Sequence, residues 1–306
     1  MADKVLVTGG AGFIGHHVVN LFLEKNYDVV VIDNLSSGSK YNLHQDSKFI
    51  ECDIRAELDD VFLKERFKYV IHLAAQPSAP NSISNPKYDC ECNVIGTINI
   101  LKASLKCDVE KVIYASTAAV YGDNKEIPLK EETLLIPTSF YGLSKLTSEH
   151  YLNLYKKIYG LDNVILRYAN VYGPKQGASG EGGVVNIFIN KIKNEDTLQI
   201  FGDGKQTRDF VYVSDVAQAN YEAVCASSSI GKDNIICNVS TKVQTSVNEL
   251  INNLMKISGK QVPVAYLESR QGDIYNSYLD NNRAQTVLGW SPKVSLYDGL
   301  SITYNS

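Results

Sequence analysis

The chain has 306 residues, of which 44% are hydrophobic and 21% are charged, and this ordinary globular composition excludes wholesale disorder. Its formal net charge is −4 and no basic stretch stands out, so neither nucleic acid nor a membrane surface is an expected partner. No apolar run approaches the ~20 residues of a membrane span, and the N-terminus turns polar too early for a signal peptide. Six cysteines show no disulfide framework and no ligand spacing, so we expect a cytoplasmic protein without a metal.

The first half of the chain alternates between short apolar runs and segments with helical spacing. Buried strands are expected at Lys4–Thr8, Asp28–Asp33, Lys48–Cys52, Tyr69–Leu73, Lys111–Ala115 and Asn163–Tyr168. Helices are expected at Phe13–Asn26 and Ile95–Ser104. Fully apolar strands that alternate with helices predict a parallel sheet covered on both faces.

Beyond Gly173 the alternation becomes less regular. The glycine-rich stretch Gln176–Gly183 suggests a domain crossing, and Val247–Ser258 has helical spacing. Two later strand-like segments, Asp209–Val213 and Ile235–Val239, could return to the main sheet. We expect a nucleotide-binding domain from residues 1–168 and about 208–241, and a smaller substrate domain from about 169–207 and 242–306.

A glycine-rich loop follows the first expected strand. Gly9, Gly12 and Gly15 give the spacing G-x-x-G-x-x-G between a strand and a helix. Such a loop lets the backbone approach a diphosphate and places it at the positive end of the helix. Asp33 closes the second strand, where a carboxylate can accept hydrogen bonds from both ribose hydroxyls of an adenosine. It would repel a 2′-phosphate, so the pattern favours NAD over NADP.

The ends of the next two strands continue this pattern. Asp53 and Ile54 follow the third strand and suit the adenine edge of the cofactor. The segment Leu73–Gln76 ends the fourth strand with small residues, as expected where the backbone passes close to a cofactor. We interpret His72 as a core histidine.

Tyr141 and Lys145 are spaced four residues apart, so on a helix they share a face. A free tyrosine has a pKa of about 10 and is a poor base at neutral pH. A nearby ammonium and a positive nicotinamide ring would favour the phenolate. The pair follows the strand end Tyr114–Thr117, and Ser139 supplies a helix-start signal.

Together these features resemble the extended short-chain dehydrogenases/reductases, and within them the nucleotide-sugar 4-epimerases. The resemblance covers essentially the whole chain. The matching stretches are TGGAGFIG (8–15), DNLSSG (33–38), HLAAQ (72–76), NVIGT (93–97), STAAVYG (116–122), YGLSK (141–145), LRYANVYGP (166–174), FGDGKQTRDFVYVSDVA (201–217), RQGD (270–273) and LGWSP (288–292).

The resemblance implies an α/β fold, namely a Rossmann-type doubly wound parallel sheet with a smaller mixed α/β substrate-binding domain. It implies that Tyr141 is the catalytic acid/base, that Lys145 holds the nicotinamide ribose and lowers the tyrosine pKa, and that Thr117 bridges the sugar oxygen to Tyr141. The implied NAD contacts are Gly9, Gly12, Phe13, Ile14, Gly15, Asp33, Asn34, Leu35, Ser36, Ser37, Gly38, Asp53, Ile54, Leu73, Ala74, Ala75, Gln76, Asn93, Tyr141 and Lys145.

The substrate side is expected to hold a nucleotide diphosphate, with UDP as the favoured nucleotide. Arg208 and Arg270 are suited to clamp phosphate oxygens, and a structural ion pair is the alternative for each. Ser277 stands where galactose epimerases carry a bulky residue, so a 2-acetamido sugar should fit. With the residues that the resemblance adds, the expected substrate contacts are Thr117, Tyr141, Asn170, Phe201, Arg208, Arg270, Asp273 and Ser277.

Related 4,6-dehydratases place Asp-Glu after their threonine, but this chain has Ala118 and Ala119, so dehydration lacks its general acid and base. We therefore expect an NAD-dependent 4-epimerase of UDP-hexoses, plain and N-acetylated, that acts through a transient 4-keto intermediate. Uronic acid epimerases fit less well, because the segment after Gly173-Pro174 lacks their arginine. A dehydratase, a reductase and a non-catalytic NAD-binding protein remain the alternatives. A homodimer is expected through helices near Asn85–Ser104 and Ser139–Lys157.

Overall fold

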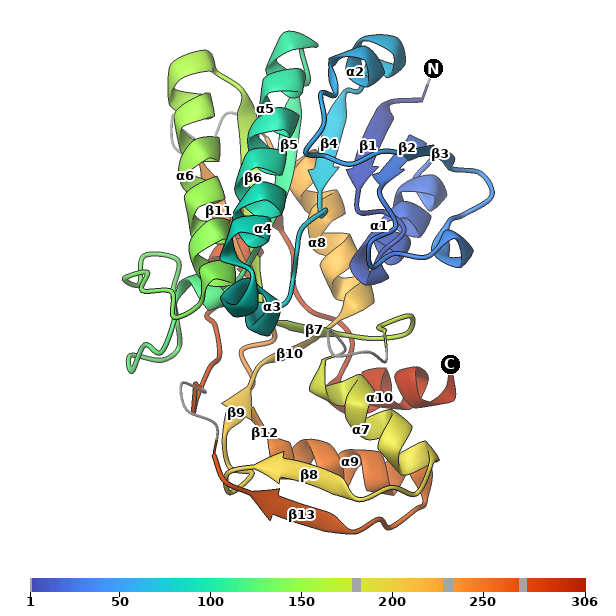
Figure 1. Cartoon of the computed structure of the whole chain (residues 1–306), viewed down its shortest axis with the longest axis vertical. Coiled ribbons are helices and arrows are strands. Elements are labelled where there is room, and N and C mark those ends of the chain that lie inside the picture. Colours follow the sequence, from blue (N-terminus) through green and yellow to red (C-terminus); the bar gives the residue numbers. More distant parts are fainter. Residues whose placement is uncertain (1, 178–182, 228–233, 270–273) are drawn as a thin grey trace.

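The computed structural model describes residues 2–177, 183–227, 234–269 and 274–306. In this part of the chain, seven strands form one parallel sheet in the order β11-β6-β5-β4-β1-β2-β3 (Figure 1). The strands are β1 (Lys4–Thr8), β2 (Asp28–Asp33), β3 (Lys48–Glu51), β4 (Tyr69–His72), β5 (Lys111–Thr117), β6 (Asp162–Tyr168) and β11 (Ile235–Val239). This topology confirms the Rossmann-type doubly wound sheet.

Helices cover both faces of the sheet, as the fully apolar strands predict. Along β1, Val5 and Val7 face one core and Leu6 faces the other, because successive side chains alternate across a strand. The helices on the Val5 face are α1 (Phe13–Glu24) and α8 (Val213–Cys225). The helices on the Leu6 face are α2 (Asp59–Glu65), α5 (Gly96–Lys106) and α6 (Phe140–Tyr159).

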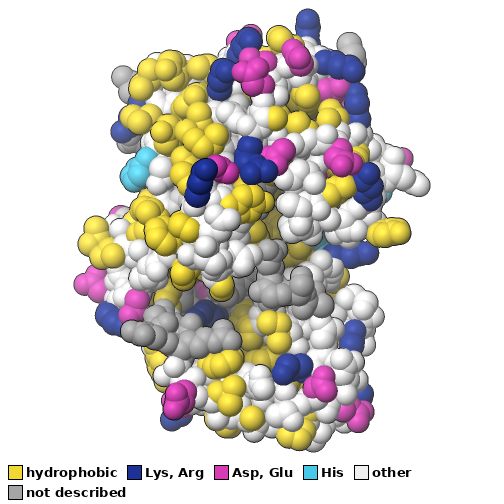
Figure 2. All heavy atoms as spheres, viewed as in Figure 1, with side chains coloured by type: hydrophobic (Ala, Val, Ile, Leu, Met, Phe, Trp, Pro, Cys, Tyr) yellow, Lys and Arg dark blue, Asp and Glu magenta, His cyan; other side chains and the backbone are white. Residues whose placement is uncertain are grey.

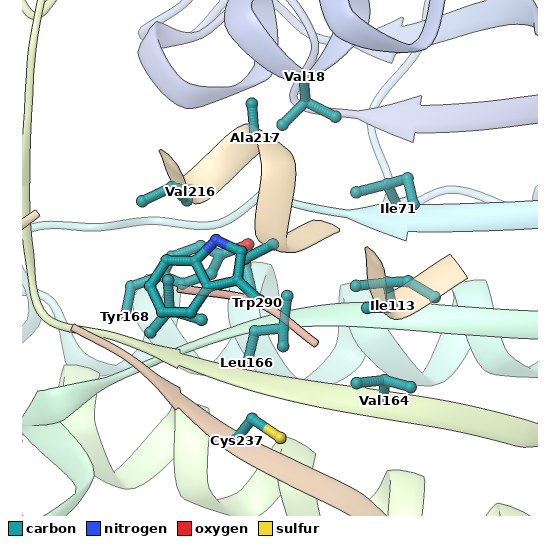
Figure 3. Close-up of a cluster of buried hydrophobic side chains, with 14 of the residues drawn as sticks. Val18, Ile71, Ile113, Val164, Leu166, Tyr168, Val216, Ala217, Cys237 and Trp290 are labelled. Carbon is teal, nitrogen blue, oxygen red and sulfur yellow. The ribbon is translucent and has the colours of Figure 1, made fainter. Parts of the chain in front are cut away.

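The core under α8 closes around Trp290, one of the largest fully buried side chains (Figure 3). Its indole Nε1 donates to the carbonyl of Asp215 at 2.8 Å. The Asp215 carboxylate accepts in turn from the backbone N–H groups of Lys293 and Val294. These bonds fix a late segment of the chain against the sheet of the first half.

A separate hydrophobic core lies below the main sheet in Figure 1, where α7 packs against α9. It includes Phe188 and Ile192 of α7 together with Leu250 and Leu254 of α9. Its elements are β7 (Asn170–Tyr172), α7 (Val184–Lys193), β8 (Leu198–Phe201), β9 (Thr207–Arg208), β10 (Phe210–Tyr212), β12 (Thr245–Ser246), α9 (Val247–Ser258), β13 (Val264–Leu267) and α10 (Leu296–Asn305). The pairs β7–β10, β9–β12 and β8–β13 form small two-stranded sheets.

One of the two expected returns to the main sheet is wrong. The segment Ile235–Val239 does join the sheet as β11, but Phe210–Tyr212 pairs with β7 alone. The buried Asp209 carboxylate explains this, because it accepts hydrogen bonds from the backbone of Thr241 and Lys242. These bonds hold the segment across the passage between the two cores instead of along the sheet.

Short helical turns complete the fold. They are η1 (Lys40–Asn42), α3 (Ala79–Ser84), α4 (Pro86–Cys90), η2 (Glu91–Ile95), η3 (Ala118–Val120) and η4 (Ala284–Leu288). The helix expected at Ile95–Ser104 therefore starts at Gly96 and follows a π-helical turn. Among the described residues, no helix combines the length and apolar character that a bilayer crossing needs.

Candidate active site

A cavity of about 980 Å³ borders the carboxyl ends of the central strands. It lies where β1 separates β2 from β4, so the chain departs in opposite directions and leaves a crevice. Most of the predicted cofactor contacts line it. They are Gly9, Gly12, Phe13, Ile14, Gly15, Asp33, Asn34, Ser36, Ser37, Asp53, Ile54, Leu73, Ala74, Ala75, Gln76, Tyr141 and Lys145.

Three of the predicted cofactor residues, Leu35, Gly38 and Asn93, are not among the described lining residues of the cavity. Leu35 has a positive φ of 58° and turns the chain after Asp33. Gly38 packs against the backbone of Ala11, where a Cβ would approach the carbonyl carbon to 3.0 Å. Asn93 is fully buried below the cavity floor.

The glycine loop fits a diphosphate. Gly9 has a φ of 72°, and a Cβ there would come within 2.8 Å of the Ala74 backbone nitrogen. A Cβ on Gly15 would collide with the carbonyl oxygen of Gly9. No side chain caps the N-terminus of α1 at Gly12, and its first turn carries no acidic residue. The first amides of this helix are therefore available to an anion in the cavity.

Two carboxylates mark the adenosine end. The Asp33 carboxylate accepts from the backbone N–H groups of Ala11 at 3.1 Å and Leu35 at 2.8 Å. Burial raises the pKa of Asp33, and these two bonds act in the opposite direction. Asp53 pairs with Arg55 and accepts from the Asn34 amide at 2.9 Å, and the arginine bond holds the pKa of Asp53 well below its usual range.

Tyr141, Thr117 and Lys145 meet at the carboxyl end of β5. Ser139 caps α6 by accepting from the Gly142 N–H at 3.1 Å, so Tyr141 lies in the first turn of the helix. The Thr117 side chain lies close enough to Tyr141 to act on the tyrosine pKa. Lys145 lies one turn further along α6, where its ammonium donates to the Ala115 carbonyl at 2.9 Å. The structure thus brings the predicted catalytic residues together.

The electrostatics of this group differ from the sequence expectation. Burial raises the pKa of Tyr141 to about 12, although the Thr117 side chain acts to lower it. Lys145 does not counter this effect, because its ammonium is directed to the Ala115 carbonyl. Burial lowers the pKa of Lys145 to about 8, while the negative charges of Asp89 and Glu149 act to raise it. Tyr141 is therefore a neutral acid and Lys145 a cation near pH 7.

A buried amide network supports the catalytic helix from below. The Asn93 amide donates to Ser144 Oγ at 3.0 Å, and its oxygen accepts from the Gln76 backbone N–H at 2.7 Å. Asn93 and Gln76 both donate to the same oxygen of the buried Asp89. Because Ser144 precedes Lys145, this network links the end of β4 to the position of the lysine.

His72 is a core histidine, as expected. Its ring is bonded to Thr8 on one side at 2.8 Å and to Thr97 on the other at 3.0 Å. Burial lowers its pKa to about 3, so the ring is neutral at physiological pH. Thr8 Oγ1 also accepts from the Ala74 N–H at 3.2 Å, so the histidine chain helps to fix the backbone of the cavity floor.

The predicted substrate residues are less closely gathered. Arg270 and Asp273 lie outside the described residues. Arg208 is half-buried on β9 and donates to the Thr207 carbonyl at 2.8 Å. The Ser277 N–H donates to the same carbonyl at 3.2 Å. Asn170 begins β7 and Phe201 ends β8, and within the described residues none of these four side chains belongs to the cavity wall.

Sequence reasoning missed part of the wall. The additional lining residues are Ile32, Ser39, Asn42, Cys52, Pro77, Asn81, Ser84, Asn85, Tyr88, Cys92, Ala115, Ser116, Tyr168, Val171, Lys175, Gln176 and Gly177. Those around α3 and α4 follow β4 directly, and the rule that ligands bind at the carboxyl ends of parallel strands could have indicated them. Those at 175–177 come from beyond the predicted domain boundary, and no local signal marks them.

Comparison with known proteins identifies the family of this chain. The NAD dependent epimerase/dehydratase family matches residues 5–239, about three quarters of the chain. The chain belongs to this family. Its cofactor is accordingly NAD, and the glycine loop, Asp33 and the cavity fit such a dinucleotide. It is an extended short-chain dehydrogenase/reductase of the nucleotide-sugar epimerase type, as the sequence motifs indicate.

Individual relatives span nearly the whole length of this family member. A putative UDP-glucose 4-epimerase of Methanocaldococcus jannaschii is 45% identical over 303 residues, covering 98% of this chain and 97% of the relative. The structure of Thermotoga maritima UDP-glucose 4-epimerase with UDP-glucose matches with a TM-score of 0.94 at 43% identity, covering 99% and 97%. A UDP-N-acetylglucosamine 4-epimerase from Methanobrevibacter ruminantium, in complex with UDP-N-acetylmuramic acid, matches with a TM-score of 0.93 at 35% identity, covering 100% and 98%.

Proposed function

We propose that this protein is an NAD-dependent UDP-hexose 4-epimerase that accepts UDP-glucose and UDP-galactose together with their 2-acetamido counterparts. The carrying observation is the group Thr117, Tyr141 and Lys145 at the carboxyl end of β5, beside the dinucleotide cavity. The relatives named above act on UDP-sugars of both kinds, and their similarity extends over the whole chain.

The chain supplies a minimal set of groups for inverting one carbinol. When bound, NAD provides a hydride acceptor and donor and a positive ring that favours the phenolate. Thr117 and Tyr141 would take the proton from the C4 hydroxyl as hydride leaves C4, and Tyr141 would return a proton to the C4 oxygen when hydride returns to the opposite face of C4. Lys145, with a pKa of about 8, keeps its charge near pH 7 and would hold the nicotinamide ribose when NAD is bound.

The same strand end argues against dehydration. Ala118 and Ala119 form the short turn after Thr117, and the Thr117 hydroxyl accepts from the Ala119 N–H at 3.2 Å. Neither alanine can supply the acid and base that loss of water requires. Dehydratase and reductase activities and a non-catalytic role remain as outcomes of the test.

We also propose that the chain is divided as the sequence predicts, with NAD held by residues 1–168 and about 208–241. The UDP-sugar would be held by about 169–207 and 242–306, with Arg208 at the border of the two parts, where it and Ser277 donate to the same Thr207 carbonyl. Separate hydrophobic cores support a division into two parts. The boundaries differ locally, because Phe210 and Tyr212 pack in the lower core and Trp290 packs in the main one. Arg208 supplies the charge for a diphosphate, and the small Ser277 side chain leaves room for an acetamido group.

The test is to incubate the purified protein separately with UDP-galactose, UDP-N-acetylgalactosamine and UDP-glucuronic acid, and to resolve products by proton NMR. Conversion of the first two to their gluco epimers is expected. Conversion of UDP-galactose alone would remove the acetamido part of the proposal. Conversion of UDP-glucuronic acid alone would show that the enzyme acts on a UDP-uronic acid and not on the proposed UDP-hexoses. The proposed reaction would be wrong in three cases. A 4-keto-6-deoxy product would indicate a dehydratase, and net NADPH consumption would indicate a reductase. No turnover with added NAD would favour a non-catalytic role.

We further propose a homodimer through α5 and α6. Apolar side chains gather over these helices in Figure 2, and Leu143, Leu154 and Ile158 of α6 are each about half exposed or more. Their spacing places them on one face of the helix. Leu152 does not belong to this face, because it is fully buried in the core beneath α6.

Charged substitutions test this face. The double variant Leu154→Lys and Ile158→Lys should elute as a monomer in light-scattering chromatography, because a cation cannot be buried unpaired in an apolar interface. The wild-type chain should elute at twice the monomer mass. A wild-type monomer would contradict the proposal.

A further inference from the structure

Two adjacent histidines in the first turns of α1 reach two different loops. The His16 Nδ1 lies 2.6 Å from the carbonyl oxygen of Asn42, in the loop that follows β2. The His17 Nε2 lies 3.0 Å from the carbonyl oxygen of Pro174, in the loop that follows β7. The two rings contact each other edge to face with centroids 5.2 Å apart. Both loops lie beside α1 in Figure 1.

The hydrogen-bond partners fix the tautomer of each ring. The Asn20 amide nitrogen can only donate, and it lies 3.2 Å from His16 Nε2, so the proton of His16 is on Nδ1. A carbonyl oxygen can only accept, so His17 carries a proton on Nε2. Burial lowers the pKa of His17, which keeps this ring neutral near pH 7. Each histidine therefore donates one hydrogen bond to one loop.

Both loops are walls of the dinucleotide cavity. Ser39 and Asn42 line it from the first loop, and residues 175–177 line it from the second. The first loop is also tied to the glycine loop, since the Ser39 N–H and the Asn42 amide both donate to the Ala11 carbonyl at 3.0 Å. The second loop is bonded on its far side, where the Asn186 amide donates to the Gln176 carbonyl at 2.7 Å. The histidines complete these attachments at α1.

We propose that His16 and His17 are positioning residues that hold the two loops closed beside the bound dinucleotide and so slow its release. A dinucleotide that leaves this cavity must pass between the loops that follow β2 and β7. His16 and His17, in one turn of α1, hold these two loops. Opening either wall requires the loss of one imidazole hydrogen bond. The inference concerns retention of the cofactor and is independent of which sugar the enzyme accepts.

The experiment measures release of NAD from the whole protein. Protein loaded with labelled NAD is chased with unlabelled NAD, without any sugar nucleotide, and the dissociation rate is read by rapid gel filtration. His16→Ala and His17→Ala remove the donors singly. His16→Asn and His17→Gln keep an amide donor near the position of the lost Nδ1 or Nε2. His44→Ala is the matched control, because this histidine accepts from the Asp46 N–H and belongs to no described cavity wall.

Each alanine variant should release NAD about fivefold faster than the wild type, as expected for the loss of one net hydrogen bond. The double variant, His16→Ala with His17→Ala, should release it about twentyfold faster, because two hydrogen bonds are lost. The Asn and Gln variants and His44→Ala should stay within about twofold of the wild type. Alanine variants that release NAD at the wild-type rate would overturn the proposal. So would Asn and Gln variants as fast as the alanine ones, because ring packing would then account for the effect. If the double variant fails to fold, the single variants decide.

Discussion

At the residue scale, the pairing of Tyr141 with Lys145 was predictable and the direction of the tyrosine pKa was not. The spacing of four residues is a local property that a helix converts into proximity. The pKa depends first on burial, which only the folded chain creates. In the same way, sequence could identify His72 as buried but could not name Thr8 and Thr97 as its partners.

Removing the Tyr141 hydroxyl should lower turnover by about 10²–10⁴-fold, the usual contribution of a positioned proton-transfer group. Tyr141→Phe keeps the ring, so the fold and the bound NAD should be retained. The readouts are initial rates with UDP-galactose and the NAD content of the purified variant. Tyr159→Phe, an exposed tyrosine at the far end of α6, is the control and should stay at the wild-type rate. Near-normal turnover of Tyr141→Phe would exclude the proposed proton transfer.

The buried Lys145 should leave a signature in the pH dependence of stability. Its pKa falls from 10.5 in the unfolded chain to about 8 in the folded one. Between these values the unfolded state binds more protons, so stability rises with pH. From about pH 7 to about pH 9.5 this residue should add about 2 kcal/mol to the free energy of unfolding.

Urea unfolding of the NAD-free protein measures this effect, and Lys145→Met removes the titration while it keeps the bulk of the side chain. The difference in unfolding free energy between wild type and variant should therefore change across the pH range. A difference that stays constant with pH would show that the lysine titrates alike in the folded and unfolded states.

At the element scale, a buried ion pair ties the catalytic helix to the sheet. Arg167 on β6 binds the Glu149 carboxylate of α6 through two nitrogens, at 3.0 and 2.7 Å, and both side chains are 2% exposed. Glu149 also accepts from Ser116 at 2.5 Å, and Arg167 donates to the Tyr121 hydroxyl at 2.9 Å. The register of α6 on β5 and β6 is therefore fixed one turn beyond Lys145.

Replacing Arg167 by Met should destabilise the protein by about 3–5 kcal/mol, because it leaves the Glu149 carboxylate buried without a cation. Urea unfolding monitored by circular dichroism measures the loss. The double variant with Glu149→Met should recover part of it, since no unpaired charge then remains. Lys125→Met, which breaks an exposed pair with Asp123, should change little. If Arg167→Met and Lys125→Met lowered the free energy of unfolding equally, burial of the Arg167–Glu149 pair could not be the cause.

The strands of the first half were predictable as elements because each is a short apolar run between turn signals. The role of Phe210–Tyr212 was not, because its partner strand is chosen by long-range hydrogen bonds to Asp209. The π-helical turn before α5 was also not predictable, since the apolar spacing continues through it unchanged. Local pattern fixes what an element is, and distant contacts decide where it pairs.

At the scale of the whole molecule, ligands of the two parts should act on different amides. NAD should slow hydrogen exchange in the first turn of α1 and in residues 33–43, several of which line the cavity, because binding favours the closed state. The amides of α9 belong to the separate lower core and should change only when a UDP-sugar is added. Mass spectrometry of exchange with each ligand measures this. Protection of α9 by NAD alone would contradict the proposed division.

The path of the chain has a consequence for inheritance and engineering. After β6 it leaves the main sheet, returns through α8 and β11, leaves again to β12, and returns once more at Trp290 before α10 ends in the lower core. The lower core is therefore not encoded by one uninterrupted stretch of the gene. A single exchange that carries the whole lower core also carries α8 and β11. A designed chimera that exchanges this core alone needs a matched junction at every passage.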